Sequence, residues 1–232
     1  MDSFSQFGED ALLWEFFSKN PRGVFVEVGA NHPTVCSQTF FLETQGWKGI
    51  LVEPLPAKAQ LLREQRPGSR VFQSAAGAPE QRGRARLAVA TSDSLSGFSP
   101  YAGAAIERFE EVQVKTLDDI LAEAGNPKLD FVSIDVEGWE LEVLRGFDLE
   151  RHRPSILLVE DHLQRLGVHR HLVRSSYRLV KRTGCNSWYV PRAAPFNLST
   201  RLERFQLWKE IHLDTPVRCV RFFFKRKFAR KS

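Results

Sequence analysis

The chain has 232 residues, of which 42% are hydrophobic and 26% charged, so it can bury a core and has the composition of a globular protein. Its net charge of +5 is concentrated at the end, because residues 217–232 hold seven basic residues and no acidic one, whereas residues 1–216 hold 26 basic and 28 acidic residues. This slightly acidic larger part argues against a nucleic-acid-binding domain with a basic face.

Neither end of the chain indicates a membrane span or a secretory leader. No apolar run approaches the ~20 residues that cross a bilayer, and residues 1–6 carry an acid where a signal peptide carries basic residues. Three scattered cysteines form no C-x-x-C pair and indicate no disulfide framework. We therefore expect a cytoplasmic protein.

Hydrophobic periodicity predicts alternating helices and strands. Helical spacing is found at residues 6–19, 37–45, 57–65, 116–124 and 139–145. Apolar runs predict strands at 24–28, 50–53, 70–75, 129–135 and 155–160, with a hairpin strand at 85–90 and a closing pair at 177–181 and 187–190. The alternation predicts an α/β fold with a mostly parallel central sheet flanked by helices. We expect one domain over 1–195, with an N-terminal helix within 1–20 covering the site, and a helical basic tail over 196–232.

Residues suited to bind a ligand end, or directly follow, four of the expected strands. They are Gly29, Glu53, Asp135 and the pair Glu160–Asp161. Since ligands bind outside the carboxyl ends of parallel strands, we expect these residues to surround one ligand. A glycine lets the backbone approach a ligand closely, and an acid about twenty residues later can bind a ribose diol. The absence of G-x-G-x-x-G favours a nucleoside-type ligand over a dinucleotide.

The sequence resembles the FkbM family of methyltransferases at several motifs. Phe25-Val-Glu-Val-Gly-Ala-Asn31, Leu51-Val-Glu-Pro54 and Val114-Lys-Thr-Leu-Asp-Asp119 match its opening motifs, and residues 131–147 match its most distinctive signature. The resemblance covers about residues 5–162. It implies a Rossmann-like class I methyltransferase fold, S-adenosylmethionine as cofactor, and transfer of the methyl group to a hydroxyl of a sugar, glycolipid or secondary metabolite.

The resemblance also implies roles for individual residues. The implied cofactor contacts are Glu27, Gly29, Ala30 and Asn31 around the methionine and ribose, Glu53 at the ribose hydroxyls, Pro54 and Leu55 beside the adenine, Ser74 and Ala75 at its amino edge, Gln6 above the cofactor, and Asp135 at the reaction centre. Position 32 holds histidine where the family often has aspartate, so the role of His32 stays open.

The acids Asp135, Glu160 and Asp161 admit three interpretations. They are similar to the ligands of metal-dependent O-methyltransferases, in which Mg²⁺ or a similar divalent cation would lower the pKa of the acceptor hydroxyl. In a metal-free alternative, Asp135 orients the acceptor and His162 or His32 removes its proton. In the third, the acids are purely structural. Glu137 is expected to act mainly as a favourable charge at a helix N-terminus.

The last segment bears on partners and acceptor. Residues 217–232 alternate basic and apolar residues, which favours peripheral contact with an anionic inner membrane surface over a packed helix or a nucleic-acid contact. Such contact would favour a glycolipid acceptor over a soluble sugar. Two other functions stay open: an RNA methyltransferase, against which the acidic larger part and the lack of an N/D-P-P-Y/F motif argue, and a scaffold that binds the cofactor without catalysis.

Overall fold

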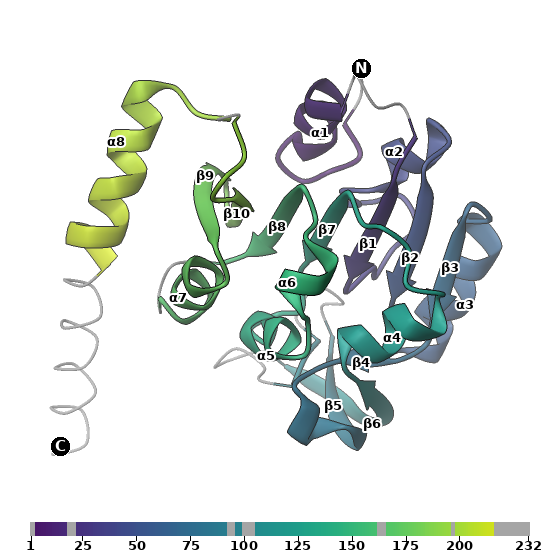
Figure 1. Cartoon of the computed structure of the whole chain (residues 1–232). Helices are drawn as coiled ribbons and strands as arrows, with labels where there is room; N and C mark the ends of the chain where they lie inside the picture. Colours follow the sequence, from purple (N-terminus) through teal and green to yellow (C-terminus); the bar gives the residue numbers. More distant parts are fainter. Residues whose placement is uncertain are drawn as a thin grey trace, which may run out of the picture.

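A seven-stranded sheet forms the centre of the molecule, in the order β3-β2-β1-β7-β8-β10-β9 (Figure 1). The computed structural model describes residues 3–17, 22–91, 96–98, 105–161, 166–195 and 198–215. The first five strands in that order run parallel, and β10 is antiparallel to both its neighbours. The strand order reverses between β1 and β7, the switch point at which Rossmann-like folds bind ligands. The expected mostly parallel α/β fold is confirmed. The strands are β1 (Val24–Val28), β2 (Lys48–Val52), β3 (Ser69–Phe72), β7 (Phe131–Ile134), β8 (Ile156–Glu160), β9 (Tyr177–Thr183) and β10 (Asn186–Pro191).

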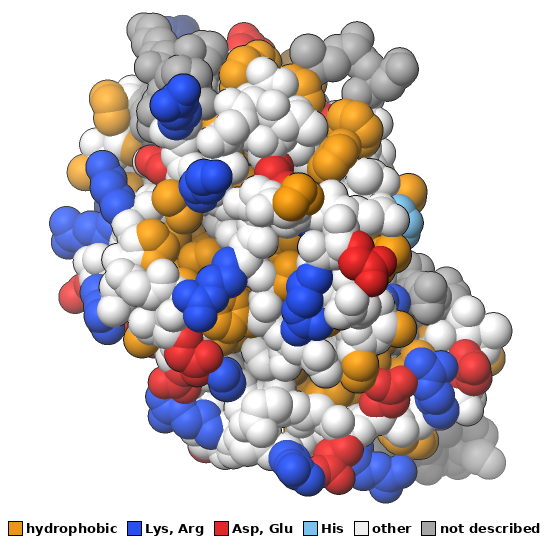
Figure 2. Space-filling model, turned by 90° about the vertical axis from the view of Figure 1, so that its right-hand side faces the viewer, with side chains coloured by type: hydrophobic (Ala, Val, Ile, Leu, Met, Phe, Trp, Pro, Cys, Tyr) orange, Lys and Arg blue, Asp and Glu red, His pale blue; other side chains and the backbone are white. Residues whose placement is uncertain are grey.

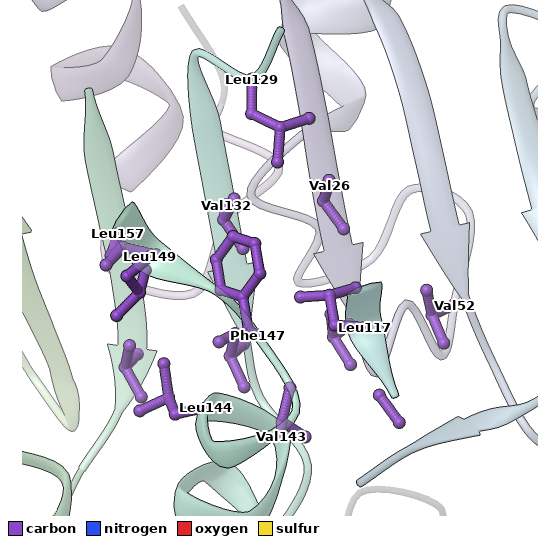
Figure 3. Packing of buried hydrophobic residues seen from close by; sticks show 14 of the residues in the cluster. Val26, Val52, Leu117, Leu129, Val132, Val143, Leu144, Phe147, Leu149 and Leu157 are labelled. Atoms are coloured by element: carbon purple, nitrogen blue, oxygen red, sulfur yellow. The ribbon is translucent and has the colours of Figure 1, made fainter. Parts of the chain in front are cut away.

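Helices cover both faces of this sheet. Along β1, Phe25 and Val26 enter opposite apolar layers because successive side chains of a strand alternate. In the Val26 layer, Val132 and Leu157 from neighbouring strands lie beside Phe147 (Figure 3), and α4 to α7 cover them. Helices α1 to α3 cover the Phe25 layer. The helices are α1 (Glu9–Phe17), α2 (Phe40–Thr44), α3 (Pro56–Gln65), α4 (Leu117–Glu123), α5 (Glu140–Arg145), α6 (Leu149–His152), α7 (Gly167–Arg174) and α8 (Arg201–Lys209), with a short 3-10 helix at Pro79–Gln81 and a π-helical turn at Glu210–Asp214.

A second, three-stranded sheet was only half predicted. It has the order β4-β6-β5, with β4 (Ala75–Ala76), β5 (Gly83–Ala90) and β6 (Ile106–Lys115). The expected hairpin strand corresponds to β5, but its partner β6 was missed because its charged residues hide the apolar alternation. The expected strand 70–75 is divided, since β3 ends at Phe72 and Ala75 pairs with Val114 in the second sheet.

Two expected helices are shorter than their hydrophobic spacing predicted. The first begins at Glu9, because the Asp10 carboxylate accepts hydrogen bonds from Ser3, Ser5 and the backbone N–H of Phe4, which fold the preceding residues into a turn. The second, α2, begins only at Phe40.

The surface and the helices show two further features. On the face shown in Figure 2, basic and acidic side chains are interspersed with apolar ones. Within the described ranges, no helix is long and apolar enough to cross a membrane.

Candidate functional site

Four strand ends lie level at one edge of the central sheet, where the sequence predicted a ligand site. Val28 of β1 pairs with Val52 of β2 and with Ile134 of β7, which in turn pairs with Val159 of β8. The residues that follow these four positions therefore lie at the same level, where these strands end. They are Gly29, Glu53, Asp135 and Glu160.

The turn after β1 requires a glycine. Gly29 has a φ of +85°, and a Cβ at this position would lie 1.8 Å from the carbonyl oxygen of Asp135. Its N–H donates to the Val52 carbonyl oxygen at 2.9 Å. Both the backbone conformation and the close approach exclude a side chain. The sequence predicted close approach of a ligand here, and the close neighbour in the structure is the backbone that follows β7.

Glu53, directly after β2, orders the same turn. Its side chain is buried, and its carboxylate accepts hydrogen bonds from the backbone N–H of Asn31 at 3.0 Å and of Leu55 at 2.8 Å. Asn31 has a left-handed φ of +49°, and its side-chain oxygen accepts a hydrogen bond from Lys58. The acid therefore joins the turn after β1 to the start of α3. Its predicted contact with ribose hydroxyls stays a prediction.

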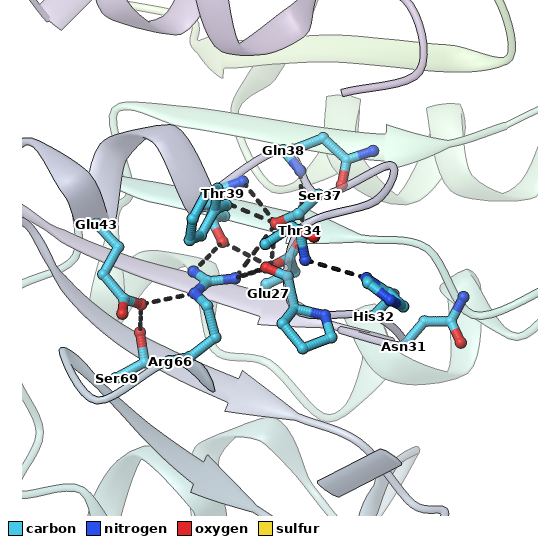
Figure 4. Close-up of polar contacts among 12 residues, drawn as sticks. Glu27, Asn31, His32, Thr34, Ser37, Gln38, Thr39, Glu43, Arg66 and Ser69 are labelled. Atoms are coloured by element: carbon cyan, nitrogen blue, oxygen red, sulfur yellow. Dashed lines mark hydrogen bonds and ion pairs between the residues drawn. The ribbon is translucent and has the colours of Figure 1, made fainter. Parts of the chain in front are cut away.

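Glu27, within β1, is 3% exposed and is held by protein donors (Figure 4). Its carboxylate accepts hydrogen bonds from the Ser37 hydroxyl, the Gln38 backbone N–H and the Thr39 hydroxyl. The Arg66 guanidinium lies 3.8 Å away, yet burial raises the pKa of Glu27. These contacts fix the chain between β1 and α2. Contact of Glu27 with a cofactor stays a prediction.

Sequence reasoning missed Arg66, whose side chain is fully buried at the end of α3. Its guanidinium donates hydrogen bonds to Glu43 at 2.8 Å, to the Thr39 hydroxyl at 3.0 Å and to the Pro33 carbonyl at 3.0 Å (Figure 4). A lone arginine at a helix end gives no sequence signal of burial, because arginines are mostly exposed. Arg66 ties the segment that follows the Gly29 turn to the body of the protein.

Three carboxylates converge where β7 and β8 end. Oxygens of Asp135, Glu137 and Glu160 lie within 4.8 Å of one another. Burial and the Glu160 charge hold the pKa of Asp135 well above its ordinary value. Burial and the Asp135 charge raise the pKa of Glu137 to about 7, and burial and the Glu137 charge raise that of Glu160 to about 7. A hydrogen bond joins Asp135 to Glu160, so the pair shares a proton between like charges.

Two neighbours shape this carboxylate cluster. Glu140, the first residue of α5, accepts hydrogen bonds from the backbone N–H of Val136 at 3.3 Å and of Gly138 at 2.8 Å, which fixes the turn after β7. Cys185, between β9 and β10, forms a side-chain hydrogen bond with Glu160. Burial and the charge of that carboxylate raise the pKa of the thiol to about 12, so the thiol stays protonated and donates.

The predicted metal set of Asp135, Glu160 and Asp161 stays a prediction, and it differs by one residue from the carboxylates that converge in the structure. Strand β8 ends at Glu160, and Asp161 lies beyond it, with its backbone N–H donating to the Cys185 carbonyl oxygen at 2.9 Å. Among the described residues, the group close enough to share an ion contains Glu137 in place of Asp161. Glu137 has a left-handed φ of +55° and enters the cluster, whereas we had expected it to serve mainly as a helix charge. Asp161 is buried near Tyr189, and burial together with the Asp161 charge raises the pKa of that phenol.

The two predicted histidine bases receive little support. The Nδ1 atom of His32 accepts hydrogen bonds from the backbone N–H of Thr34 at 3.2 Å and of Val35 at 3.0 Å. This arrangement places the proton of a neutral ring on Nε2, which leaves no free nitrogen lone pair to remove a proton. His162 lies outside the described residues. Both roles stay predictions.

The residues expected beside the adenine lie between the two sheets. Leu55 and Ala75 share a small apolar cluster with Val114 of β6. Ser74 is 3% exposed, and its hydroxyl has no hydrogen-bond partner among the described residues. A buried hydroxyl without a partner is costly, so Ser74 is suited to meet a polar ligand atom.

The N-terminal segment docks on the hairpin that carries Cys185. The Glu9 carboxylate accepts hydrogen bonds from the Thr183 hydroxyl at 2.7 Å and the Asn186 amide at 2.9 Å. Gln6, in the turn before α1, is exposed, and its contact with the cofactor stays a prediction.

Comparison with known proteins identifies the family to which most of this chain is similar. A family model described as the methyltransferase FkbM domain matches residues 27–175, from within β1 to just beyond α7. This match covers more than half of the chain and all four strand ends. A search of curated proteins found no match.

Three similar solved structures share little sequence identity with this chain. They include precorrin-6y C5,15-methyltransferase from Geobacter metallireducens (12% identity, TM-score 0.43, 78% of this chain and 85% of that one). The putative methyltransferase yhhF from Escherichia coli is 14% identical, with a TM-score of 0.44 over 83% of this chain and 90% of that one. A TehB-like SAM-dependent methyltransferase from Corynebacterium glutamicum is 10% identical, with a TM-score of 0.43 over 81% and 88%. Likenesses this low carry no information about substrate.

Proposed function

The chain belongs to the family of FkbM methyltransferase domains, and on that premise we propose that it transfers the methyl group of S-adenosylmethionine to a hydroxyl oxygen. Its family makes it a methyltransferase that uses this cofactor. The acceptor atom, the acceptor class and the need for a metal are the proposed parts.

The residues at the strand ends fit S-adenosylmethionine. The Gly29 turn and the buried Glu53 carboxylate stand at the switch point of the sheet, where a nucleoside binds in such folds. The Ser74 hydroxyl, buried without a partner among the described residues, supplies a hydrogen-bonding group for the adenine end. When bound, the cofactor supplies an electrophilic sulfonium methyl group. The protein must then orient a nucleophile and accept its proton.

The observation that carries the proposal is the carboxylate cluster. Asp135, Glu137 and Glu160 give three oxygen ligands of the kind that Mg²⁺ prefers, and burial together with the neighbouring carboxylate charges raises the pKa of each, so the fully ionised metal-free cluster is disfavoured. A divalent cation held there would remove that repulsion and acidify an acceptor hydroxyl. This supports the metal-dependent interpretation of the three that the sequence left open.

The same observation supplies a metal-free alternative. A carboxylate whose pKa is about 7 is suited to take a proton near neutral pH, so Glu137 or Glu160 would act as the general base in place of a histidine. Dependence of turnover on a divalent cation separates the two mechanisms.

The charges around the site favour a neutral acceptor such as a sugar or glycolipid hydroxyl. Glu140 adds a fourth carboxylate beside the other three, and a polyanionic RNA backbone would be repelled by them. In addition, the face shown in Figure 2 carries both signs of charge in place of one continuous basic surface.

Labelled methyl transfer tests the proposal. The full chain is incubated with methyl-labelled S-adenosylmethionine and separate lipid, polysaccharide and RNA extracts, with Mg²⁺ or with EDTA. We expect label in lipid or polysaccharide that resists mild alkali, because a methyl ether survives treatment that cleaves a methyl ester. Label only in RNA would contradict the acceptor class. Tight cofactor binding without transfer to any extract would identify a non-catalytic scaffold.

A further inference from the structure

Helix α8 stands at the outer edge of the molecule with an apolar side that the described residues leave uncovered. It lies beside β9, the last strand of the sheet (Figure 1), and the Lys181 ammonium of β9 forms an ion pair with Glu203 at 2.9 Å. None of the nine residues of α8 is buried. A helix on a globular protein ordinarily buries an apolar stripe, so this one departs from the usual arrangement.

The exposed apolar residues are large and adjacent. Leu202 is 66% exposed, Phe205 61%, and Trp208 and Leu213 each 49%. The rings of Phe205 and Trp208 stack with centroids 6.2 Å apart. Their spacing of three to five residues places them on one side of α8 and the helical turn that follows it. Single exposed apolar residues are common, but a contiguous group on one helical side marks an interaction surface.

Charge is segregated around the same helix. With ~3.6 residues per turn, the basic residues Arg201, Arg204 and Lys209 lie on the same side of the helix as the exposed apolar residues. The acidic residues lie on the other side, where Glu203 faces the body of the protein through Lys181. The outer side of α8, defined here by Leu202, Phe205, Trp208, Leu213 and these three basic residues, is therefore both apolar and cationic.

We propose that the outer side of α8 docks on an anionic lipid surface. Such a surface offers negative headgroups to the basic residues and an apolar layer to Phe205 and Trp208, and aromatic rings favour that boundary. Self-association through this side would bring two copies of the same cationic surface together, because a two-fold interface pairs a surface with itself. The sequence adds seven basic residues between positions 217 and 232, directly after the described part of this segment. The inference goes beyond the proposed function and does not rest on it.

Vesicle binding of the full chain tests this surface. We expect the chain to co-sediment with vesicles of phosphatidylcholine and phosphatidylglycerol, to stay in solution with phosphatidylcholine alone, and to be released by high salt. The double variant Phe205→Ser/Trp208→Ser should bind the anionic vesicles at least about tenfold more weakly. Both side chains are exposed, so this change should leave the fold and the melting temperature intact. Asp214→Asn, an exposed acid in the same segment, is the matched control and should bind at least as well as the unaltered chain.

A second readout locates the contact. Vesicles of brominated phosphatidylglycerol should quench tryptophan fluorescence, and Trp208→Phe should remove the largest part of that quenching, because Trp47 and Trp188 are 1% exposed and Trp14 and Trp139 are half-buried. A variant in which the seven basic residues of 217–232 are changed to glutamine separates the two segments. If it loses all binding while Phe205→Ser/Trp208→Ser keeps it, the surface is not α8. A dimer in light scattering that the double variant dissociates, without vesicle binding, would assign this side to a second copy and overturn the proposal.

Discussion

The Cβ that any other residue would add to Gly29 falls 1.8 Å from the Asp135 carbonyl oxygen, so two strand ends of the site meet through their backbones. Gly29→Ala should therefore lower the free energy of unfolding by at least about 3 kcal/mol, through the left-handed conformation and the clash together. Gly46→Ala is the matched control, since Gly46 also has a left-handed φ of +91° but no atom within 4 Å of the added Cβ. It should cost about 1–2 kcal/mol. Urea unfolding measures both, and equal losses would contradict the close approach.

The buried Arg66 should matter more for stability than any exposed arginine. Arg66→Met leaves Glu27 and Glu43 without their cation, and we expect a loss of about 3–5 kcal/mol in the free energy of unfolding. Arg82→Met provides the control, because Arg82 pairs with Asp119 at 2.7 Å but its side chain is 52% exposed. That change should cost at most about 1 kcal/mol.

A double variant checks the cause of the Arg66 effect. Adding Glu27→Gln to Arg66→Met removes one buried charge and should recover part of the lost stability. No recovery would show that packing of the guanidinium, and not its charge, is what the site requires.

The three converging carboxylates predict which acids bind a divalent cation. Glu137→Gln and Glu160→Gln should each weaken Mg²⁺ binding by at least about tenfold in calorimetry, because each removes one of three converging ligands. Asp161→Asn should leave the affinity unchanged. The opposite pattern, with Asp161 essential and Glu137 dispensable, would restore the set that the sequence predicted. Melting temperatures of all three variants exclude loss of fold as the explanation.

The raised carboxyl pKa values predict an acid-favoured stability. In the folded state Glu137 and Glu160 titrate near pH 7, but in the unfolded chain near their ordinary value of 4.5. Their contribution is therefore present below about pH 4.5 and is lost as the pH rises to about 7. With EDTA present to keep the protein metal-free, the contribution of Glu137 and Glu160 to the free energy of unfolding should fall by about 1–2 kcal/mol from pH 5 to pH 8. This value allows for solvent screening of these partly exposed groups.

Histidines act in the opposite direction and require a control. Burial lowers the pKa of His152, His169 and His171, so their contribution rises with pH up to about 6.5. The measured quantity is therefore the difference between the unaltered chain and Glu160→Gln, each unfolded by urea at pH 5 and pH 8. A pH dependence that is the same in both proteins would contradict the shift at Glu160.

The sequence by itself determined the strands of the central sheet and the residues at their ends. Strands with runs of apolar residues, such as 156–159, must be buried on both faces, and this places Gly29, Glu53, Asp135 and Glu160 at one edge before any coordinates are known. The family signature lies in the same local segments. These features depend on neighbours in the chain, which is why a linear pattern can reveal them.

Tertiary structure alone decided how those residues are used. Glu137 enters the cluster through a left-handed turn that Glu140 holds, whereas Asp161, beyond the end of β8, is buried near Tyr189. Arg66, Cys185 and the uncovered side of α8 depend on contacts between segments far apart in the chain, or on their absence among the described residues. Burial and the pairing of charges are properties of assembled segments, so only the packed structure could assign these roles.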